Sequence, residues 1–223
     1  MYKRQDITLS GGTLSDFTKS NSTVYTATFT PSGDGAKAID IAENTFSDAA
    51  GNRNNASTQF NWTYDSTAPS AFQVGSVITI ASSNDNVIAG YWNVHNTHVD
   101  ITVPLDSADT SLYETDPASA SSGATANIQL LASTDAGSSY SNLGSAYNTQ
   151  SSDVSNGSKV IRVSAATLEA IASVDGGVFT FNADITDNVG NTTRGTASAT
   201  TLTIDQTKPV SYTHLTLPTK RIV

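Results

Sequence analysis

Two short segments of the chain carry the same oxygen-rich side chains around a glycine. Residues 48–52 and 187–191 both have the form Asp-x-x-Gly-Asn. Carboxylates, Asn amides and backbone carbonyls held by a tight turn are the ligands that Ca²⁺ prefers. The same residue types also build turns without any metal, because Asp and Asn hydrogen-bond to nearby backbone and Gly adopts a positive φ. The spacing is not that of an EF-hand loop, so a calcium site and a plain turn both stay open.

A second shared segment follows each of these turns. Residues 65–69 read Asp-Ser-Thr-Ala-Pro, and residues 205–209 read Asp-Gln-Thr-Lys-Pro. The turn Asp precedes the Asp of this second segment by 17 residues in the first copy and by 18 in the second. A turn, a strand-length run and a fixed exit that recur in this way indicate tandem repeated domains. The linker is a few residues long and contains Pro, so we expect semi-rigid modules.

Composition narrows the class of protein. The chain has 223 residues, a net charge of -9 and no cysteine. The absence of cysteine excludes disulfides, thiolate metal sites and a cysteine nucleophile. Its acidity argues against nucleic acid and anionic membranes as partners, and we expect no membrane insertion, since no stretch is long and apolar enough and no signal peptide opens the chain.

The pattern of apolar residues predicts an all-β fold. Short runs rich in Thr, Val, Ile, Phe and Tyr are separated by clusters of Gly, Asn and Asp. Residues 164–172 are the only stretch that we expect to be helical, with Ser164 as its N-cap and Leu168 and Ile171 on one face. We read residues 105–123 as a polar surface loop. The expected strands are residues 6–10, 24–30, 38–42, 58–64, 72–80, 87–92, 99–105, 126–132, 138–143, 159–163, 178–186 and 196–204.

Both ends of the chain are similar to translated sequencing adapter. Residues 210–219, back-translated codon by codon, match a transposase mosaic end with its adjoining adapter, and residues 1–5 match the same element on the opposite strand. We therefore expect residues 1–5 and 210–223 to be artefacts and exclude them from the fold. The remaining segment is expected to hold a partial domain at 6–65 and a complete domain at 66–209. The partial domain should be marginally stable, because missing strands leave a sheet edge and a core face uncovered.

The repeated turn and exit, the strand alternation and the single helix together resemble bacterial Ig-like repeats of large surface adhesins, of the RTX and biofilm-associated type. The resemblance covers nearly all of residues 6–209. It implies tandem Ig-like Greek-key β-sandwiches, the first one truncated, in a secreted or cell-surface bacterial protein. It also implies neighbouring Ig-like repeats of the same chain as partners, and a glycan or host ligand bound by other parts of the parent protein.

The resemblance also gives the calcium interpretation a location. In an Ig sandwich the chain leaves at the end opposite the last hairpin loop, so the 187–191 turn is expected to face the first exit. Ions at such joints stiffen linear arrays in the adhesins that the chain resembles. The 48–52 turn would face a preceding domain. The candidate calcium ligands are Asp65, Asp187, Asn188, Asn191, Asp184, Asp48 and Asn52, with Asp85 as a further helper.

Other chemistry has less support in the sequence. His95 and His98 are spaced like a zinc pair but lack a third ligand, so a solvent-facing loop is expected. No Gly-x-Ser-x-Gly elbow is present, and the three glutamates, Glu43, Glu114 and Glu169, fall in loop or helix contexts. Paired carboxylates for glycoside chemistry stay open. Three aromatic residues could stack on sugar rings, although core or rim positions explain them more simply: Tyr91, Trp92 and Tyr113.

These observations favour a non-catalytic structural extender of a large bacterial adhesin, with calcium at the joint as an added stiffener. The alternative is a carbohydrate-binding accessory module of a secreted hydrolase. An exposed, flat platform of Tyr91, Trp92 and Tyr113 would favour that alternative. An enzyme would need a concave pocket with convergent carboxylates, and no motif predicts one.

Overall fold

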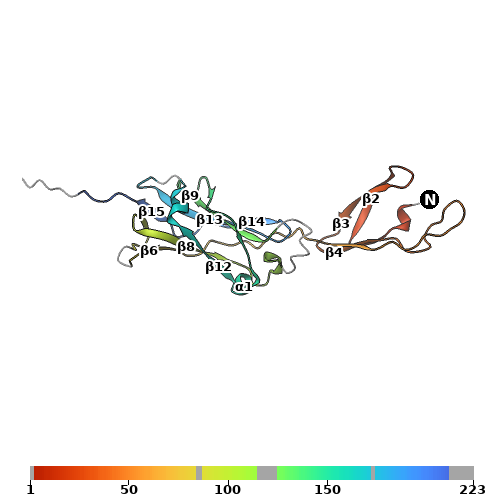
Figure 1. Ribbon diagram of the computed structural model, residues 1–223, viewed down its shortest axis with the longest axis horizontal. Coiled ribbons are helices and arrows are strands. Elements are labelled where there is room, and N and C mark those ends of the chain that lie inside the picture. The colour runs from red at the N-terminus through yellow and green to blue at the C-terminus, as the bar shows by residue number, and fades with distance from the viewer. Residues whose placement is uncertain (1–2, 84–86, 115–124, 172–173, 211–223) are drawn as a thin grey trace, which may run out of the picture. The chain divides into compact units, whose positions relative to one another are not determined.

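A computed structural model describes residues 3–83, 87–114, 125–171 and 174–210 of the chain (Figure 1). The chain divides into two compact units, which we call unit 1 (Met1–Thr67) and unit 2 (Ala68–Val223). The division falls inside the 65–69 exit segment. The fold is all-β, with sandwich-like sheets and very short helices. In the described part of the chain, no helix is long and apolar enough to span a membrane.

Unit 1 consists of a three-stranded sheet and a separate hairpin. The sheet has the order β1-β4-β5, and the hairpin pairs β2 with β3, all antiparallel. Alternation places Ile39 and Trp62 on the face of the sheet that meets Phe29 of the hairpin, since the Trp62 and Phe29 rings lie 4.9 Å apart, edge to face. The strand bounds are β1 Thr8–Ser10, β2 Gly12–Lys19, β3 Tyr25–Pro31, β4 Gly35–Asp40 and β5 Phe60–Tyr64.

Unit 2 is built from two larger sheets. One has the order β10-β9-β13-β15-β7, with β11 also on β9 and β14 also on β13, and the other has the order β12-β8-β6. Neighbouring strands are antiparallel except β15 and β7, which are parallel. The bounds are β6 Val77–Ala81, β7 Tyr91–Asn93, β8 Asn96–Pro104, β9 Asn127–Ser133, β10 Ser141–Asn142, β11 Tyr147–Asn148, β12 Ser158–Ser164, β13 Val178–Thr186, β14 Thr192–Arg194 and β15 Leu202–Asp205.

The core of unit 2 lies between these two sheets. Strand β8 alternates fully buried Val99, Ile101 and Val103 with polar residues, as expected of a strand with one face in the core. Strand β13 contributes Phe179 and Phe181, whose rings lie 6.1 Å apart. The close packing of aromatic and β-branched side chains is the main source of stability for this unit.

The helices of the described residues are short. Helix α2 (Ala165–Glu169) confirms the predicted helix and its cap, because the Ser164 hydroxyl accepts a hydrogen bond from the Thr167 N–H at 3.2 Å. Leu168 is fully buried and Ile171 packs against the core. The expectation of a single helix was wrong, since α1 (Ser151–Ser155) also forms, and single-turn 3-10 helices occupy Arg4–Asp6 and Thr110–Leu112.

Several expected strands differ from the structure. The polar run at Gly12–Lys19 was not predicted as a strand, but it is β2, because β3 supplies its hydrogen-bond partners. The expected strand at 72–80 is shorter, since residues before β6 lie beside Thr196 through a parallel bridge at Gln73. The expected strand at 87–92 is reduced to β7. The expected last strand at 196–204 begins only at β15, and β14 precedes it.

The prediction of a polar surface loop at residues 105–123 was wrong for the first part of this segment. Leu112 is 1% exposed and belongs to the core, so the first part of this segment is not a surface loop. Its short 3-10 turn is capped by Asp109, whose carboxylate accepts from the Ser111 N–H at 3.0 Å. Residues 115–124, the helper Asp85, and most of the two end segments read as adapter lie outside the described residues.

Candidate functional site

The Asp-x-x-Gly-Asn turn of unit 2 is organised by one buried carboxylate. Asp187 follows β13 directly and is 0% exposed. Its Oδ1 atom accepts hydrogen bonds from the backbone N–H groups of Val189 at 2.9 Å, Gly190 at 2.7 Å and Asn191 at 2.9 Å. Its Oδ2 atom accepts from the Asn191 side-chain amide at 2.9 Å. Gly190 has a φ of +102°, a conformation that only glycine adopts without strain.

The turn of unit 1 repeats this arrangement on the surface. Asp48 Oδ1 accepts from the N–H groups of Ala50 and Asn52 at 2.9 and 2.8 Å, and Oδ2 accepts from the Asn52 amide at 2.8 Å. Gly51 has a φ of +91°. These hydrogen bonds, that of the Asn52 amide first, hold the pKa of Asp48 below its ordinary value. The sequence motif therefore specifies one turn geometry twice, with its Asp buried in unit 2 and exposed in unit 1.

A second repeated feature, which we call the exit latch, fixes the segment that leaves unit 1. It consists of Asp34, which precedes β4, and the two residues after Asp65. Asp34 accepts from the N–H and the hydroxyl of Ser66, both at 2.8 Å, and from the Thr67 hydroxyl at 2.5 Å. Asp65 caps the same turn by accepting from the Thr67 N–H at 2.9 Å. The Thr67 hydroxyl, followed by Ser66, lowers the pKa of Asp34.

Unit 2 has the same latch at its own exit. Asp175, which lies before β13, accepts from the Gln206 N–H at 2.7 Å and from the Thr207 hydroxyl. These two donors, Thr207 first, lower the pKa of Asp175. Glu169 of α2 adds a further contact, since its Oε1 atom accepts from the Gln206 amide at 3.0 Å and from the indole N–H of Trp92 at 3.1 Å. The exit of unit 2 is thereby connected to the aromatic core.

The sequence analysis did not identify Asp34 and Asp175. The signal was available, because each is followed by Gly and a strand, and they precede Asp65 and Asp205 by 31 and 30 residues. An Asp-Gly pair before a strand is usually read as a turn, however, and the sequence does not show that it reaches a segment so far along the chain. Only the antiparallel pairing of β4 with β5, and of β13 with β15, brings the two segments together.

The proposed calcium ligands are distributed over both units. Asp48, Asn52 and Asp65 belong to unit 1, and the remaining four belong to unit 2. Both carboxylate oxygens of Asp184 accept from the Arg194 guanidinium at 2.8 Å, so this residue forms an ion pair. The backbone N–H of Asn188 donates to the backbone carbonyl of Ser111 at 2.9 Å. In the described ranges, no three Asp, Glu or His side chains gather as a metal site, and hydrogen bonding within each turn accounts for Asp48 and Asp187.

The two histidines occupy different environments. His95 is exposed in the turn before β8, as expected. His98 was expected in the same loop, and this was wrong, because it lies within β8, the central strand of its sheet, opposite Ile80 and Ser164. Its Nδ1 atom lies 2.9 Å from the Thr97 hydroxyl. Because β8 pairs with both β6 and β12, it begins at Asn96, before residue 99, where the apolar pattern predicted its start.

The aromatic platform that would favour sugar binding does not form. Trp92 is 0% exposed and is the largest fully buried side chain among the described residues. Tyr91, its neighbour in β7, is 44% exposed and points to the other face, and Tyr113 packs against the core. The simpler interpretation of Trp92 as a core residue is therefore confirmed.

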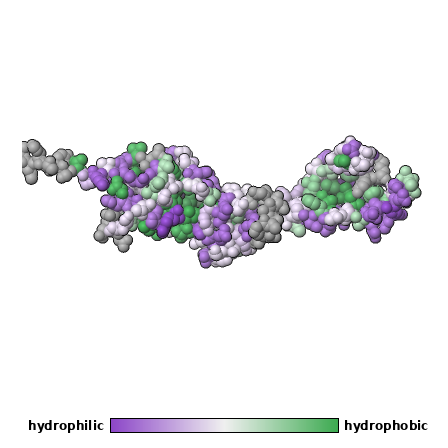
Figure 2. Space-filling view, viewed as in Figure 1, coloured by the Kyte–Doolittle hydropathy of each residue, from purple (hydrophilic) through white to green (hydrophobic). Residues whose placement is uncertain are grey.

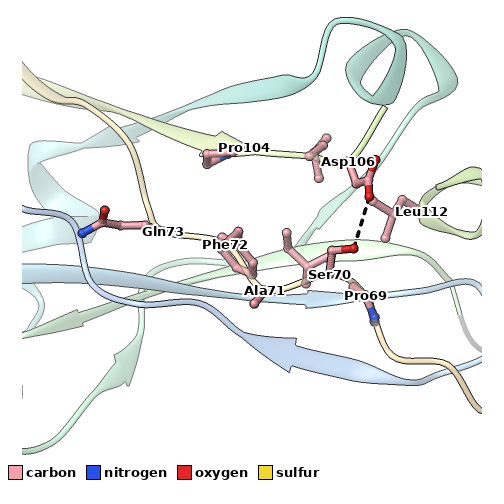
Figure 3. A pocket seen from close by; sticks show the side chains of 10 residues that line it. Pro69, Ser70, Ala71, Phe72, Gln73, Pro104, Asp106 and Leu112 are labelled. Atoms are coloured by element: carbon pink, nitrogen blue, oxygen red, sulfur yellow. Dashed lines mark hydrogen bonds between the residues drawn. The ribbon is translucent and has the colours of Figure 1, made fainter. Parts of the chain in front are cut away.

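The cleft drawn in Figure 3 lies within unit 2 and has a volume of about 320 Å³. Pro69, Phe72, Pro104 and Leu112 are among the residues that line it. Among the described residues that line the cleft, Asp106 alone is charged, and it accepts from the Ser70 hydroxyl at 3.1 Å. These described residues do not provide the paired carboxylates that glycoside chemistry needs.

Comparison with known proteins agrees with this architecture for one part of the chain. Residues 2–65 match the family model of the bacterial Ig-like domain. A comparison with curated proteins found none that matches the chain. The family match supports an Ig-like repeat. The N-terminal segment of the chain, which forms unit 1, is thus similar to the bacterial Ig-like domain.

Proposed function

We propose that the chain is a non-catalytic structural spacer, built from tandem Ig-like modules of a large secreted or cell-surface bacterial adhesin. The observation that carries this proposal is the repeated exit latch. In both units one carboxylate before a strand holds the two residues that follow the exit aspartate, Asp65 or Asp205. A spacer must transmit a direction from one module to the next, and a hydrogen-bonded exit does so better than a free linker.

The spacer role can be tested by the width of the distance distribution between the two units. The chain has no cysteine, so the double variant Asn55→Cys/Ala199→Cys introduces one label in each unit at an exposed position. Single-molecule energy transfer should give one narrow distribution. It should broaden in Asp34→Ala, which removes the latch of unit 1, and should stay narrow in Asp16→Ala, an exposed carboxylate on β2 outside the latch. A broad distribution in the parent protein would contradict the proposal.

Calcium at the joint is a separate part of the proposal. It rests on Asp65 and on the 187–191 turn, whose residue types suit a hard cation. If Ca²⁺ binds only the folded state, a free Ca²⁺ concentration of 100 times the Kd would stabilise that state by about 2.7 kcal/mol. Thermal unfolding of the full chain should therefore show a higher Tm with Ca²⁺ than with chelator, and Asp65→Ala should remove the difference. An unchanged Tm would leave the turns as hydrogen-bonded turns alone, without affecting the spacer proposal.

A further inference from the structure

The first residues of unit 2 run beside the residues that lead to its last strand. Residues 69–75, which we call the entry segment, lie parallel to residues 193–198, through a bridge between Gln73 and Thr196. Figure 3 shows most of the entry segment. Two backbone hydrogen bonds join the segments: the Val74 N–H donates to the Thr196 carbonyl at 3.0 Å, and the Thr196 N–H donates to the Phe72 carbonyl at 2.9 Å. The entry of the unit and the approach to its last strand are therefore joined directly.

Side chains reinforce this pairing along its length. Three of them donate to a backbone carbonyl of the opposite segment: Thr193 Oγ1 to Pro69 at 2.6 Å, Gln73 Nε2 to Ala197 at 3.2 Å and Ser198 Oγ to Gly75 at 2.7 Å. The ring of Phe72 lies directly over Gly195, where an added Cβ would come within 2.5 Å of the ring. A larger residue would displace the ring, so this close fit of the entry segment requires glycine.

Residues 193–198 are anchored on their other side too. The Gly195 N–H donates to the Ala183 carbonyl at 3.0 Å. The Ser198 N–H donates to the Phe181 carbonyl at 2.9 Å. Ala183 and Phe181 belong to β13 and are fully buried. The entry segment is thus attached, through residues 193–198, to a strand that the core of unit 2 holds in place.

The relative direction of the two segments decides how they respond to tension. The chain enters unit 2 at the start of the entry segment and leaves it beyond the far end of β15. Because the segments are parallel, tension along the chain pulls them in opposite directions along their common axis. The hydrogen bonds between them are then loaded together, whereas pulling both segments from the same end would break the bonds one at a time.

Solvent exposure gives this geometry its importance. Gln73 and Thr196 are exposed, and hydrophilic side chains are frequent on the visible face of unit 2 (Figure 2). Water therefore competes for these bonds, and each of them adds little to the stability of unit 2 at equilibrium. When they are loaded together, however, they must all fail before the entry segment can detach, which slows unfolding under force.

We propose that the entry segment and residues 193–198 form a mechanical clamp, which lets unit 2 carry tension along the chain without unfolding. The inference deepens the proposed spacer function and rests on it, because a spacer is pulled through the entry and the exit of each module. The clamp adds a property that a spacer need not have. A module whose entry and exit segments were antiparallel could hold the same direction and would unfold at a lower force.

The clamp can be tested by pulling unit 2 in two directions within the full chain. The variant Ala68→Cys/Lys208→Cys attaches handles at the entry and the exit, and Ala68→Cys/Thr192→Cys attaches them at the same end of both segments. All three positions are exposed, and the chain has no cysteine of its own. The mean unfolding force in optical tweezers should be at least about twofold higher in the first variant, because its clamp is loaded as a whole. Urea midpoints check that both variants are folded.

Removing bonds of the clamp should lower the resistance to force more than the equilibrium stability. In the first pulling direction, Gln73→Ala/Thr193→Val removes two side-chain bonds and should lower the mean unfolding force by at least about a quarter, while the urea midpoint changes little. Ser155→Ala is the matched control. It removes a bond of the same kind within α1, from the Ser155 hydroxyl to the Ser151 carbonyl at 2.8 Å, and should leave the force unchanged.

Equal unfolding forces in the two pulling directions would overturn the clamp, and so would an unchanged force in Gln73→Ala/Thr193→Val. A fall of the same size in Ser155→Ala would also overturn it, since the force would then follow general stability. The spacer proposal fails by a different result, a broad distance distribution between the units. Equal forces together with a narrow distribution would therefore discard the clamp and keep the spacer.

Discussion

The buried turn at Asp187 gives the most demanding prediction for stability. The change Asp187→Ala removes a fully buried carboxylate that accepts from three backbone N–H groups and one side-chain amide, in hydrogen bonds that are partly buried. A buried donor left without a partner costs about 1–3 kcal/mol, and bonds to a charged acceptor are worth about 1.5–3 kcal/mol each. The turn can relax to recover part of this, so we expect the free energy of unfolding of unit 2 to fall by about 3–4 kcal/mol.

Urea unfolding followed by tryptophan fluorescence measures this loss. The chain has two tryptophans, one in each unit, so a Trp62→Phe background leaves Trp92 as the reporter of the unit 2 core. With an m value of about 1–3 kcal/mol/M, the midpoint should fall by roughly 1–4 M while m itself stays unchanged. An altered m would indicate a change in the denatured state or a loss of two-state behaviour.

Asp135 provides the matched control in the same unit. Its exposed carboxylate organises a turn too, by accepting from the Ser133 hydroxyl at 2.5 Å and from the N–H and hydroxyl of Ser139 at 2.9 and 2.6 Å. Water can replace it there, so Asp135→Ala should shift the midpoint far less than Asp187→Ala. Equal shifts for the two variants would refute the argument that burial, rather than the number of hydrogen bonds, sets the cost.

Three smaller predictions concern caps, turns and pH. Removing the helix cap with Ser164→Ala should lower the stability of unit 2 by about 1 kcal/mol in the same urea assay, and no change would contradict the cap. Gly190→Ala should cost at least about 1 kcal/mol, because a Cβ is strained at a φ of +102°, and a neutral result would mean that the turn adopts another conformation. The lowered pKa of Asp175 means that the latch contributes its full stability above the ordinary value of 3.8 and loses it only as the pH falls through the lower folded pKa. NMR titration of the Asp175 carboxyl carbon should therefore show its midpoint below 3.8, and a midpoint at or above 3.8 would contradict the latch.

The sequence predicted the all-β class and the repeated turns because both depend on local chemistry. Residues 178–186 were predicted as a strand with the bounds that β13 has, and the Ser164 cap predicted the start of α2. Strands without an apolar pattern were missed, and β2 is the clearest case, since its polar sequence is extended by pairing with β3. Strand ends were misplaced where the pairing partner changes, as before β6, where Gln73 forms a bridge to Thr196 while β6 itself pairs with β8.

The candidate site was predictable only in part for the same reason. The Asp-x-x-Gly-Asn turns are closed by atoms within five residues, so their sequence specifies them. The exit latch joins residues more than 30 positions apart, and the fold has to bring Asp34 to Ser66 before the contact exists. Burial was equally hidden, because Asp48 and Asp187 occupy identical motifs, yet one is exposed and the other is fully enclosed.

The most direct test of the spacer account is the backbone mobility of the exit residues. ¹⁵N relaxation of the full chain measures order parameters at Ser66, Thr67, Gln206 and Thr207, the four residues held by the two latches. We expect values of about 0.85, as in the strands, with a fall at Ser66 and Thr67 but not at Gln206 when Asp34 is replaced by Ala. Values below about 0.6 at these residues in the unmodified chain would mean that the modules are freely jointed, and would contradict the account.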